Sequence, residues 1–354
     1  MKKVKYIPVF RARQQENLVL ASFNFGPSLV PMVEVVKEKD RVNNPKSTIE
    51  IYTEIFNGIN STKLLVDLPI YISPNLSTSE EVIKFFRSTI SNLDRRIAFF
   101  KSFAGLSKKV IPVLSSLAPQ TGETDTILTQ FKALKDKFPV IAFRIFFKGF
   151  DMSFKEVTKT GARPEDLLIY DLDTIPFTSP VVKKHRQELK TLKNFCAVIR
   201  SAINTEIQNT KLDPGEVIGE ADNSLLEFYK EGRDRFDAFG DFVGIKKDEM
   251  TAGGTISPGF IFYDPLDNLY YGYKGKVKML SEFEDTIVPE VLASKMVAAM
   301  KKTHPSYLTK NEGFETLLRI KSGKESGKSQ AKFKRIAMEH YLHCLWTKAN
   351  EGTL

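Results

Sequence analysis

The sequence has few residues that could form covalent cross-links, because only two cysteines, Cys196 and Cys344, occur among its 354 residues. Two cysteines are too few for a disulfide framework, and their scarcity favours a reducing compartment. The first residues hold no apolar run of the length a signal peptide needs, and no stretch approaches the roughly 20 consecutive apolar residues of a membrane span. We therefore expect a cytoplasmic protein that makes no membrane contact.

Histidine is also scarce, with four residues in the chain. His185 lies in a charged helical pattern and the other three lie beyond residue 300, so the sequence offers no Ser-His-Asp or Cys-His set for covalent hydrolysis. His340, His343 and Cys344 fall within one helical turn, a spacing that can bind a transition metal. The sequence supplies no clear fourth ligand, so ordinary packing is the favoured interpretation and we expect no metal there.

The composition is that of a folded protein, with 42% hydrophobic and 27% charged residues. The net charge of +9 is uneven, because residues 274–354 carry 15 Lys and Arg against 9 Asp and Glu. A basic excess suits a polyanion or an acidic partner. It is much sparser than the Lys/Arg blocks of nucleic-acid tails, so a solvated surface is the favoured interpretation.

Short apolar segments alternate with amphipathic stretches along the first 250 residues. The apolar segments are residues 5–10, 29–36, 63–71, 109–114, 140–147, 167–171, 196–201 and, weakest, 236–244. The amphipathic stretches are residues 14–23, 47–59, 77–103, 123–137, 153–161, 180–193 and 224–231. Strands that are apolar on both faces and separated by helices pair in parallel, and eight such units predict a closed (β/α)8 TIM-barrel-like fold of the α/β class.

The main competing fold is an open doubly wound sheet, which normally has a glycine-rich turn after its first strand. This chain has RARQQE at that place and no such glycines. The absence favours the barrel.

The pattern changes beyond residue 250, so we expect a barrel over residues 1–250 and an appendage over 251–354. FIFYDPLDNLYYGY predicts an aromatic β-hairpin, and two helical patterns follow it. The hairpin aromatics and the lysines after them resemble a surface for single-stranded nucleic acid, but a buried packing face is favoured. SGKESGKS, residues 322–329, fails the spacing of a phosphate-binding P-loop and reads as a flexible basic connector.

Charged residues gather at the ends of the predicted barrel strands. They are Arg11, Arg13, Glu34, Asp67, Arg144, Asp171, Arg200 and Asp241. The C-terminal strand ends of such a barrel surround its functional mouth, so this set predicts either a ligand or catalytic site or a ring of ion pairs that holds the strands in register. We expect Arg144 and Arg200 each to pair with one of the four carboxylates.

The carboxylates also allow a catalytic alternative. Four carboxylates at one mouth could hold Mg²⁺ or Mn²⁺, with the two arginines clamping a phosphate, as in a metal-dependent phosphodiesterase or nuclease. Against this alternative, the sequence places no histidine near these strands as an acid or base. No catalytic residue and no cofactor follows from the residues themselves.

The same segments carry a family resemblance. YIPVFRARQQE, LVPMVEV, LLVDLPIY, VIPVLSS, VIAFRIF, LLIYDLD, AVIRSAI and FGDFVGI occur in this order, and the chain resembles the beta family, named for a phage protein called beta, over about residues 4–273. The resemblance implies a TIM-barrel-like architecture and a setting in phage–host conflict, but no agreed reaction. It also implies recurring functional positions at Glu16, Glu34, Asp67, Arg144, Asp171, Arg200 and Asp241.

One departure from the family is visible before the first glutamate. Family members usually have a lysine-containing segment there, where this chain has Arg11 and Arg13, which puts in doubt any role for a titratable amine. We expect a barrel whose charged mouth recognises a ligand or partner, either a protein or a nucleotide or nucleic acid, in phage defence or counter-defence.

Overall fold

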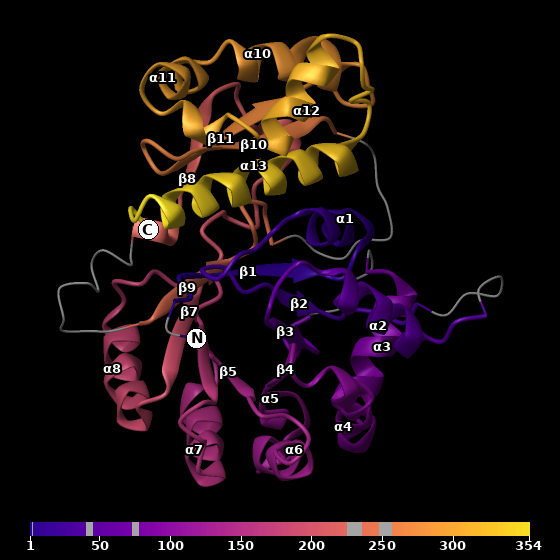
Figure 1. Cartoon of the computed structure of the whole chain (residues 1–354), viewed down its shortest axis with the longest axis vertical. Coiled ribbons are helices and arrows are strands. Elements are labelled where there is room, and N and C mark those ends of the chain that lie inside the picture. The colour runs from indigo at the N-terminus through magenta and orange to yellow at the C-terminus, as the bar shows by residue number, and fades with distance from the viewer. Residues whose placement is uncertain (2, 40–44, 73–77, 225–235, 248–256) are drawn as a thin grey trace.

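The computed structural model describes residues 1, 3–39, 45–72, 78–224, 236–247 and 257–354. Figure 1 shows helices packed around the strands of a barrel, and a second group of helices and strands above it. The long C-terminal helix lies between the two groups. Among the described residues, no helix combines the length and the apolar character that crossing a membrane requires.

Eight parallel strands form a closed barrel in the order β1-β2-β3-β4-β5-β6-β7-β9. Their bounds are β1 (Tyr6–Arg11), β2 (Met32–Glu34), β3 (Leu64–Asp67), β4 (Val110–Leu114), β5 (Ala142–Phe146), β6 (Leu167–Asp171), β7 (Phe195–Ile199) and β9 (Ala238–Asp241). The last strand pairs in parallel with both β7 and β1 and so closes the ring. The predicted (β/α)8 fold is confirmed.

Alternate side chains of each strand point to opposite faces of the barrel wall. Along β1, Ile7 and Val9 belong to the inner apolar cluster that the strands form among themselves. Tyr6 and Phe10 belong instead to the large outer cluster, which includes the helices. Both faces of the strands are therefore buried, and this is why they read as continuous apolar runs in the sequence.

Closure of the barrel depends on a glycine in β9, the strand that the sequence predicted least clearly. A Cβ atom on Gly240 would lie 2.6 Å from the carbonyl oxygen of Ile7 and 2.9 Å from a side-chain carbon of Ile199. These residues belong to the two strands that flank β9. Only a residue without a side chain lets β9 approach both neighbours this closely.

Eight helices of the described chain pack around the barrel. Their bounds are α1 (Gln14–Ser22), α2 (Thr48–Gly58), α3 (Glu80–Ile90), α4 (Leu93–Lys101), α5 (Ala118–Thr121), α6 (Thr126–Leu134), α7 (Phe150–Thr160) and α8 (Pro180–Leu189). The predicted stretch 77–103 forms two helices, because the Asn92 side chain caps α4 by accepting a hydrogen bond from the backbone N–H of Arg95. The predicted helix at 224–231 lies almost wholly outside the described residues.

The C-terminal part is built on an antiparallel sheet in the order β10-β11-β8. Its elements are β8 (Glu216–Glu220), β10 (Gly259–Asp264), β11 (Leu269–Lys274), η5 (Phe283–Ile287), α10 (Val288–Leu292), α11 (Lys295–Thr303), α12 (Glu312–Lys321) and α13 (Gln330–Asn350). The predicted hairpin is β10 and β11, which lie outside the barrel wall. Strand β8 precedes residue 250 and yet joins this sheet. The division of the chain into two parts at residue 250 stays a prediction.

Candidate functional site at the barrel mouth

A layer of charged side chains closes the C-terminal end of the barrel interior. Each of these side chains follows an apolar inner residue by two positions, so the alternation of the strand directs it inward. They are Arg11 on β1, Glu34 on β2, Asp67 on β3, Arg144 on β5 and Asp171 on β6, and all five are buried. The layer lies at the end where TIM barrels carry their functional sites.

Arg144 is the centre of this layer and is fully buried. Its Nη1 donates to Glu34 Oε1 at 2.7 Å and to Asp67 Oδ2 at 2.5 Å. Its Nε and Nη2 donate to Asp171 Oδ2 at 3.0 and 2.5 Å. One guanidinium group therefore joins three carboxylates from three different strands. We call Glu34, Asp67, Arg144 and Asp171 the Arg144 cluster.

Charge interactions within the cluster shift its pKa values in different directions. Burial would lower the pKa of Arg144, but Asp171, Glu34 and Asp67 hold it well above its ordinary value. Burial raises the pKa of Asp67, and Arg144 offsets only part of this rise. Burial also opposes ionisation of Asp171, yet Arg144 and Lys247 bring its pKa below the ordinary value. Arg144 is therefore firmly charged. Of the two aspartates, Asp67 is the one whose burial is less fully offset by neighbouring cations.

Tyr71 and Arg11 lie next to the cluster. The hydroxyl of Tyr71 donates to Glu34 Oε2 at 2.6 Å, and Arg11 Nε lies 3.5 Å from the same oxygen. The ring centroid of Tyr71 is 5.2 Å from the guanidinium carbon of Arg144 and 3.9 Å from Nζ of Lys247, both within cation–π distance. Burial and the neighbouring Glu34 raise the pKa of Tyr71 well above 10, so its hydroxyl stays a hydrogen-bond donor.

Lys247 is a residue of the mouth that the sequence did not reveal. Its Nζ lies 2.6 Å from Asp173 Oδ1 and 5.1 Å from the ring centroid of Phe242. The Lys247 side chain is only 8% exposed, whereas that of Asp173 is 59% exposed. Lys247 lies six residues beyond the end of β9, outside any periodic pattern, so no sequence signal located it.

Arg200 and Asp241 lie outside the charged layer, because they are one position out of phase with the inward-pointing side chains. Arg200 lies two positions after Val198, and Asp241 lies two positions after Phe239. Val198 and Phe239 both belong to the outer cluster that faces the helices. Arg200 pairs with Asp222, its Nη1 donating to the two carboxylate oxygens at 2.7 and 2.9 Å. The prediction that Arg200 pairs with one of the four carboxylates is therefore wrong.

Asp241 joins the barrel to the C-terminal helix. It accepts hydrogen bonds from the Tyr6 hydroxyl of β1, from the Tyr341 hydroxyl of α13 at 2.5 Å and from the backbone N–H of Val243 at 2.8 Å. Burial raises the pKa of Asp241 to about 6 in spite of these hydrogen bonds. A Cβ atom on Gly244 would lie 2.6 Å from the Tyr341 ring, so the absence of a side chain lets α13 approach the barrel.

Arg13 and Glu16 occupy the start of the first helix. Arg13 is the N-cap residue of α1 and is partly exposed, and Glu16 lies in the first turn and is buried. A carboxylate in the first turn interacts favourably with the positive end of the helix dipole. Whether Arg11, Arg13, Glu16 and the Arg144 cluster bind a ligand stays a prediction.

A family model described as Beta protein matches residues 6–345. The chain belongs to the Beta protein family. The resemblance seen in the sequence is thereby confirmed over nearly the whole chain, including the C-terminal helices, where the sequence matched less clearly.

Among solved structures, the crystal structure of the GH18 chitinase ChiB from the chitin utilization locus of Flavobacterium johnsoniae is similar at 12% identity and a TM-score of 0.35. The alignment covers 99% of this chain and 95% of that chain. A likeness this weak carries no argument about the Beta protein family. No curated protein matches the chain.

The Arg144 cluster of this Beta protein family member differs from a metal centre. In a carboxylate metal site the oxygens point at one metal cation. Here the guanidinium of Arg144 takes that central place and donates hydrogen bonds to all three carboxylates. In the part of the chain that the structure describes, no group of three or more His, Cys, Asp or Glu side chains is placed to hold a metal ion. The cluster is an ion network in which one guanidinium group is hydrogen-bonded to three carboxylates.

The histidines of α13 take part in packing. The ring nitrogens of His340 lie 2.8 Å from the carbonyl oxygen of Tyr263 and 2.9 Å from the side-chain amide of Asn311. Nε2 of His343 lies 3.0 Å from the carbonyl oxygen of Ser306. These contacts agree with the packing interpretation of the histidine pattern.

The aromatic hairpin also packs rather than facing solvent. All six of its aromatic side chains are buried, none more than 4% exposed, and they are Phe260, Phe262, Tyr263, Tyr270, Tyr271 and Tyr273. Phe262 stacks on His340 of α13 with ring centroids 4.3 Å apart. The packing interpretation is confirmed, since bases could not stack on buried rings.

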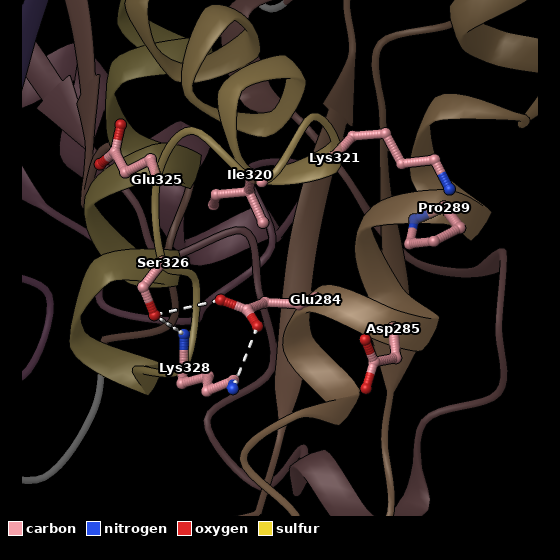
Figure 2. Close-up of a pocket in the computed structure, with 9 residues that line it drawn as sticks. Glu284, Asp285, Pro289, Ile320, Lys321, Glu325, Ser326 and Lys328 are labelled. Atoms are coloured by element: carbon pink, nitrogen blue, oxygen red, sulfur yellow. Dashed lines mark hydrogen bonds and ion pairs between the residues drawn. The ribbon is translucent and has the colours of Figure 1, made fainter.

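The glycine-punctuated segment at 322–329 lines a cleft of about 530 Å³ in the C-terminal part (Figure 2). The segment surrounds a carboxylate of its own chain, Glu284 (Figure 2). Glu284 Oε1 accepts from the backbone N–H of Gly327 at 2.6 Å and from Ser326 Oγ at 3.1 Å, and Lys328 Nζ lies 3.6 Å from Oε2. These donors outweigh burial and lower the pKa of Glu284. The segment therefore anchors η5 to the connection between α12 and α13.

Proposed function

We propose that this Beta protein family member acts by recognition and binds a phosphate-bearing ligand of the nucleotide class at the barrel mouth. The observation that carries the proposal is the environment of Lys247. Its ammonium group is held by Asp173, whose side chain is largely exposed. Because the Asp173 carboxylate is largely exposed, it stays solvated when it leaves Lys247, and a phosphate group could replace it without leaving a buried charge unpaired.

The neighbours of Lys247 suit the rest of such a ligand. Arg11 lies beside the Tyr71 hydroxyl, with 3.5 Å between its Nη2 and the phenolic oxygen, and offers a second cation for phosphate. The Tyr71 ring, which Lys247 now contacts, would offer a face for a nucleobase once the ammonium turns to the phosphate. The Arg144 cluster beneath would hold Tyr71 in place through Glu34.

The alternative is a metal-dependent phosphodiesterase or nuclease that uses the same carboxylates. It would require Glu34, Asp67 and Asp171 to exchange Arg144 for a divalent cation, leaving a fully buried arginine without its partners. Uncompensated buried charges cost several kcal/mol. The geometry therefore favours recognition over this chemistry.

The proposed setting is phage–host conflict, as a component of phage defence or of counter-defence. Its support is the membership of the Beta protein family, because the family resemblance implies such a setting.

We expect nucleoside monophosphates to bind the wild-type protein in calorimetric titrations, with AMP as the first probe and adenosine as the phosphate-free control. Lys247→Gln is expected to weaken AMP binding by about 10-fold to 100-fold, because a charge-assisted hydrogen bond contributes about 1.5–3 kcal/mol. Asp173→Asn is expected to strengthen it, since the competing carboxylate is gone.

Lys246→Gln is the matched control, because Lys246 is the neighbouring lysine and donates to the carbonyl oxygen of Ile207, not to the mouth. Equal losses from Lys246→Gln and Lys247→Gln would contradict the assignment of the site. Failure of every nucleoside monophosphate to bind the wild type would contradict the proposed function itself.

A further inference from the structure

Three buried polar atoms, one of them in the Arg144 cluster, have no hydrogen-bond partner among the described residues. They are Asp67 Oδ1, Arg96 Nη1 and Ser115 Oγ. All three residues are fully buried. A buried polar atom normally finds a partner in the protein or in an ordered water molecule, since leaving it unpaired costs free energy. These three unpaired atoms therefore need an explanation.

The three residues belong to one connected region. Arg96 on α4 donates from Nε to Gln130 Oε1 at 3.0 Å, and the same Gln130 side chain donates to the carbonyl oxygen of Ser115 at 3.1 Å. Nη2 of Arg96 lies 3.9 Å from Asp67 Oδ1. Ser115 directly follows β4 and lies two positions after Val113, which is paired in register with Asp67 of the neighbouring strand β3.

The separation of Arg96 from Asp67 is the decisive distance. The 3.9 Å between Arg96 Nη2 and Asp67 Oδ1 is too long for a hydrogen bond, and Arg96 Nη1 and Asp67 Oδ1 both lack a partner among the described residues, which together raise the question of a water molecule between the two side chains. Arg96 cannot easily close the gap, because its Nη2 also donates to the carbonyl oxygen of Leu68 at 2.6 Å and its Nε is fixed by Gln130. Moving the guanidinium toward Asp67 would break both hydrogen bonds.

We infer that one buried water molecule bridges Arg96 to Asp67, and that Arg96 thereby acts as a positioning residue of the barrel mouth. The water accepts from Arg96 Nη1 and donates to Asp67 Oδ1, and the Ser115 hydroxyl provides a third partner. Three polar partners are the usual number for a buried water molecule.

The charges of the two residues support this arrangement. Burial lowers the pKa of Arg96 to about 10, and Asp67 partly reverses that shift. Burial raises the pKa of Asp67, and Arg96 acts in the opposite direction together with Arg144. Each group thus helps to keep the other ionised across the gap, although the two do not touch.

The consequence for the mouth follows from the contacts of Asp67. Its other oxygen, Oδ2, accepts from Arg144 Nη1, so the orientation of this carboxylate helps to set the position of the guanidinium. Arg144 in turn contacts the Tyr71 ring that Lys247 covers. Where ligand affinity is concerned, this role of Arg96 rests on the proposed function, but the bridging water does not.

A high-resolution crystal structure of the wild-type protein tests the bridge directly. We expect a single ordered water at about 2.7–3.2 Å from both Asp67 Oδ1 and an Nη atom of Arg96. A direct hydrogen bond between Arg96 and Asp67, or a gap with no ordered water, would overturn the inference. This experiment needs no variant and no ligand.

The positioning role is tested by the titration of Asp67 in protein carrying ¹³C-labelled aspartate, observed by NMR. Arg96→Met is expected to raise the pKa of Asp67 by about one unit or more, because a nearby cation is lost. Arg95→Met is the control, since Arg95 is the neighbouring residue of α4 and pairs at the surface with Glu38. A lowered melting temperature with an unchanged Asp67 titration would show a merely structural role and refute positioning.

If Arg96→Met does not fold, Arg96→Lys provides the second variant, because it keeps the charge but cannot reach both Asp67 and Gln130. Arg96→Lys is expected to shift the Asp67 titration less than one unit and to displace the water, and an unchanged water position would refute the bridge. Failure of AMP to bind the wild type would remove the proposed function without affecting either readout.

Discussion

Replacing Arg144 by methionine is expected to lower the free energy of unfolding by about 3–5 kcal/mol, because it leaves buried carboxylates without their counter-ion. Three carboxylates depend on this one guanidinium, and each of the three is at most 1% exposed. The methionine side chain has a similar length, so the decrease in the free energy of unfolding would come mainly from the lost positive charge. Urea-induced unfolding followed by circular dichroism measures it.

Arg95→Met is the matched control for Arg144→Met. Arg95 pairs with Glu38, and both side chains are about half exposed, so its loss is expected to cost no more than about 1 kcal/mol. A loss of stability in Arg144→Met no greater than in Arg95→Met would mean that the Arg144 cluster does not hold the strand ends together. A gain in stability would indicate a site kept for function at the expense of the fold.

The second large effect concerns the pH dependence of stability. The pKa of Asp241 rises from its ordinary 3.8 to about 6 in the folded protein because of burial. A raised pKa means that the folded state holds the proton more tightly, so this contribution to stability is present below pH 3.8 and is lost as the pH rises through 6. The shift corresponds to about 3 kcal/mol. The substitution Asp241→Asn removes the titrating carboxyl group, so the variant does not lose this stability as the pH rises.

His340 acts in the opposite direction over an overlapping range. Burial lowers its pKa from 6.5 to about 4, so its contribution is present above pH 6.5 and is lost as the pH falls through 4. The two effects partly cancel in the wild type, and the difference between variant and wild type isolates Asp241. We expect Asp241→Asn to gain about 2–3 kcal/mol relative to the wild type between pH 4 and pH 7.

Asp213→Asn provides the control for this pH series, because the Asp213 side chain is 76% exposed. Its stability relative to the wild type is expected to stay nearly constant over the same pH range. A constant difference for Asp241→Asn as well would mean that Asp241 is solvated or paired with a cation in solution, and the docking of α13 through Tyr341 would need revision.

The barrel could be predicted from the sequence because its signal is local. A parallel strand buried on both faces reads as a short apolar run, and all eight runs became strands of the barrel. Strand β8 could not be predicted, since Glu216–Glu220 is short, largely exposed and flanked by two glutamates, and it is a strand only through its pairing with β11. Pairing between distant segments leaves no periodic pattern in either of them.

The mouth could be predicted only in part. Charge at a strand end located Glu34, Asp67, Arg144 and Asp171, but charge alone does not give direction. The alternation of inner and outer residues would have excluded Arg200 from this group, since it is one position out of phase with Ile199, which faces inward. Lys247 and Arg96 lie outside the barrel strands, where no strand alternation applies, and only the folded chain brings them to the carboxylates.

The most direct test of the central claim is a calorimetric titration of AMP into the wild-type protein in the presence of EDTA. The claim is that the barrel mouth recognises phosphate through Lys247 and its neighbours while Arg144, not a metal, pairs with the carboxylates. It predicts saturable binding in EDTA, with an affinity that excess Mn²⁺ leaves unchanged. Binding that appears only when Mn²⁺ replaces EDTA would contradict the claim and favour the metal-dependent phosphodiesterase.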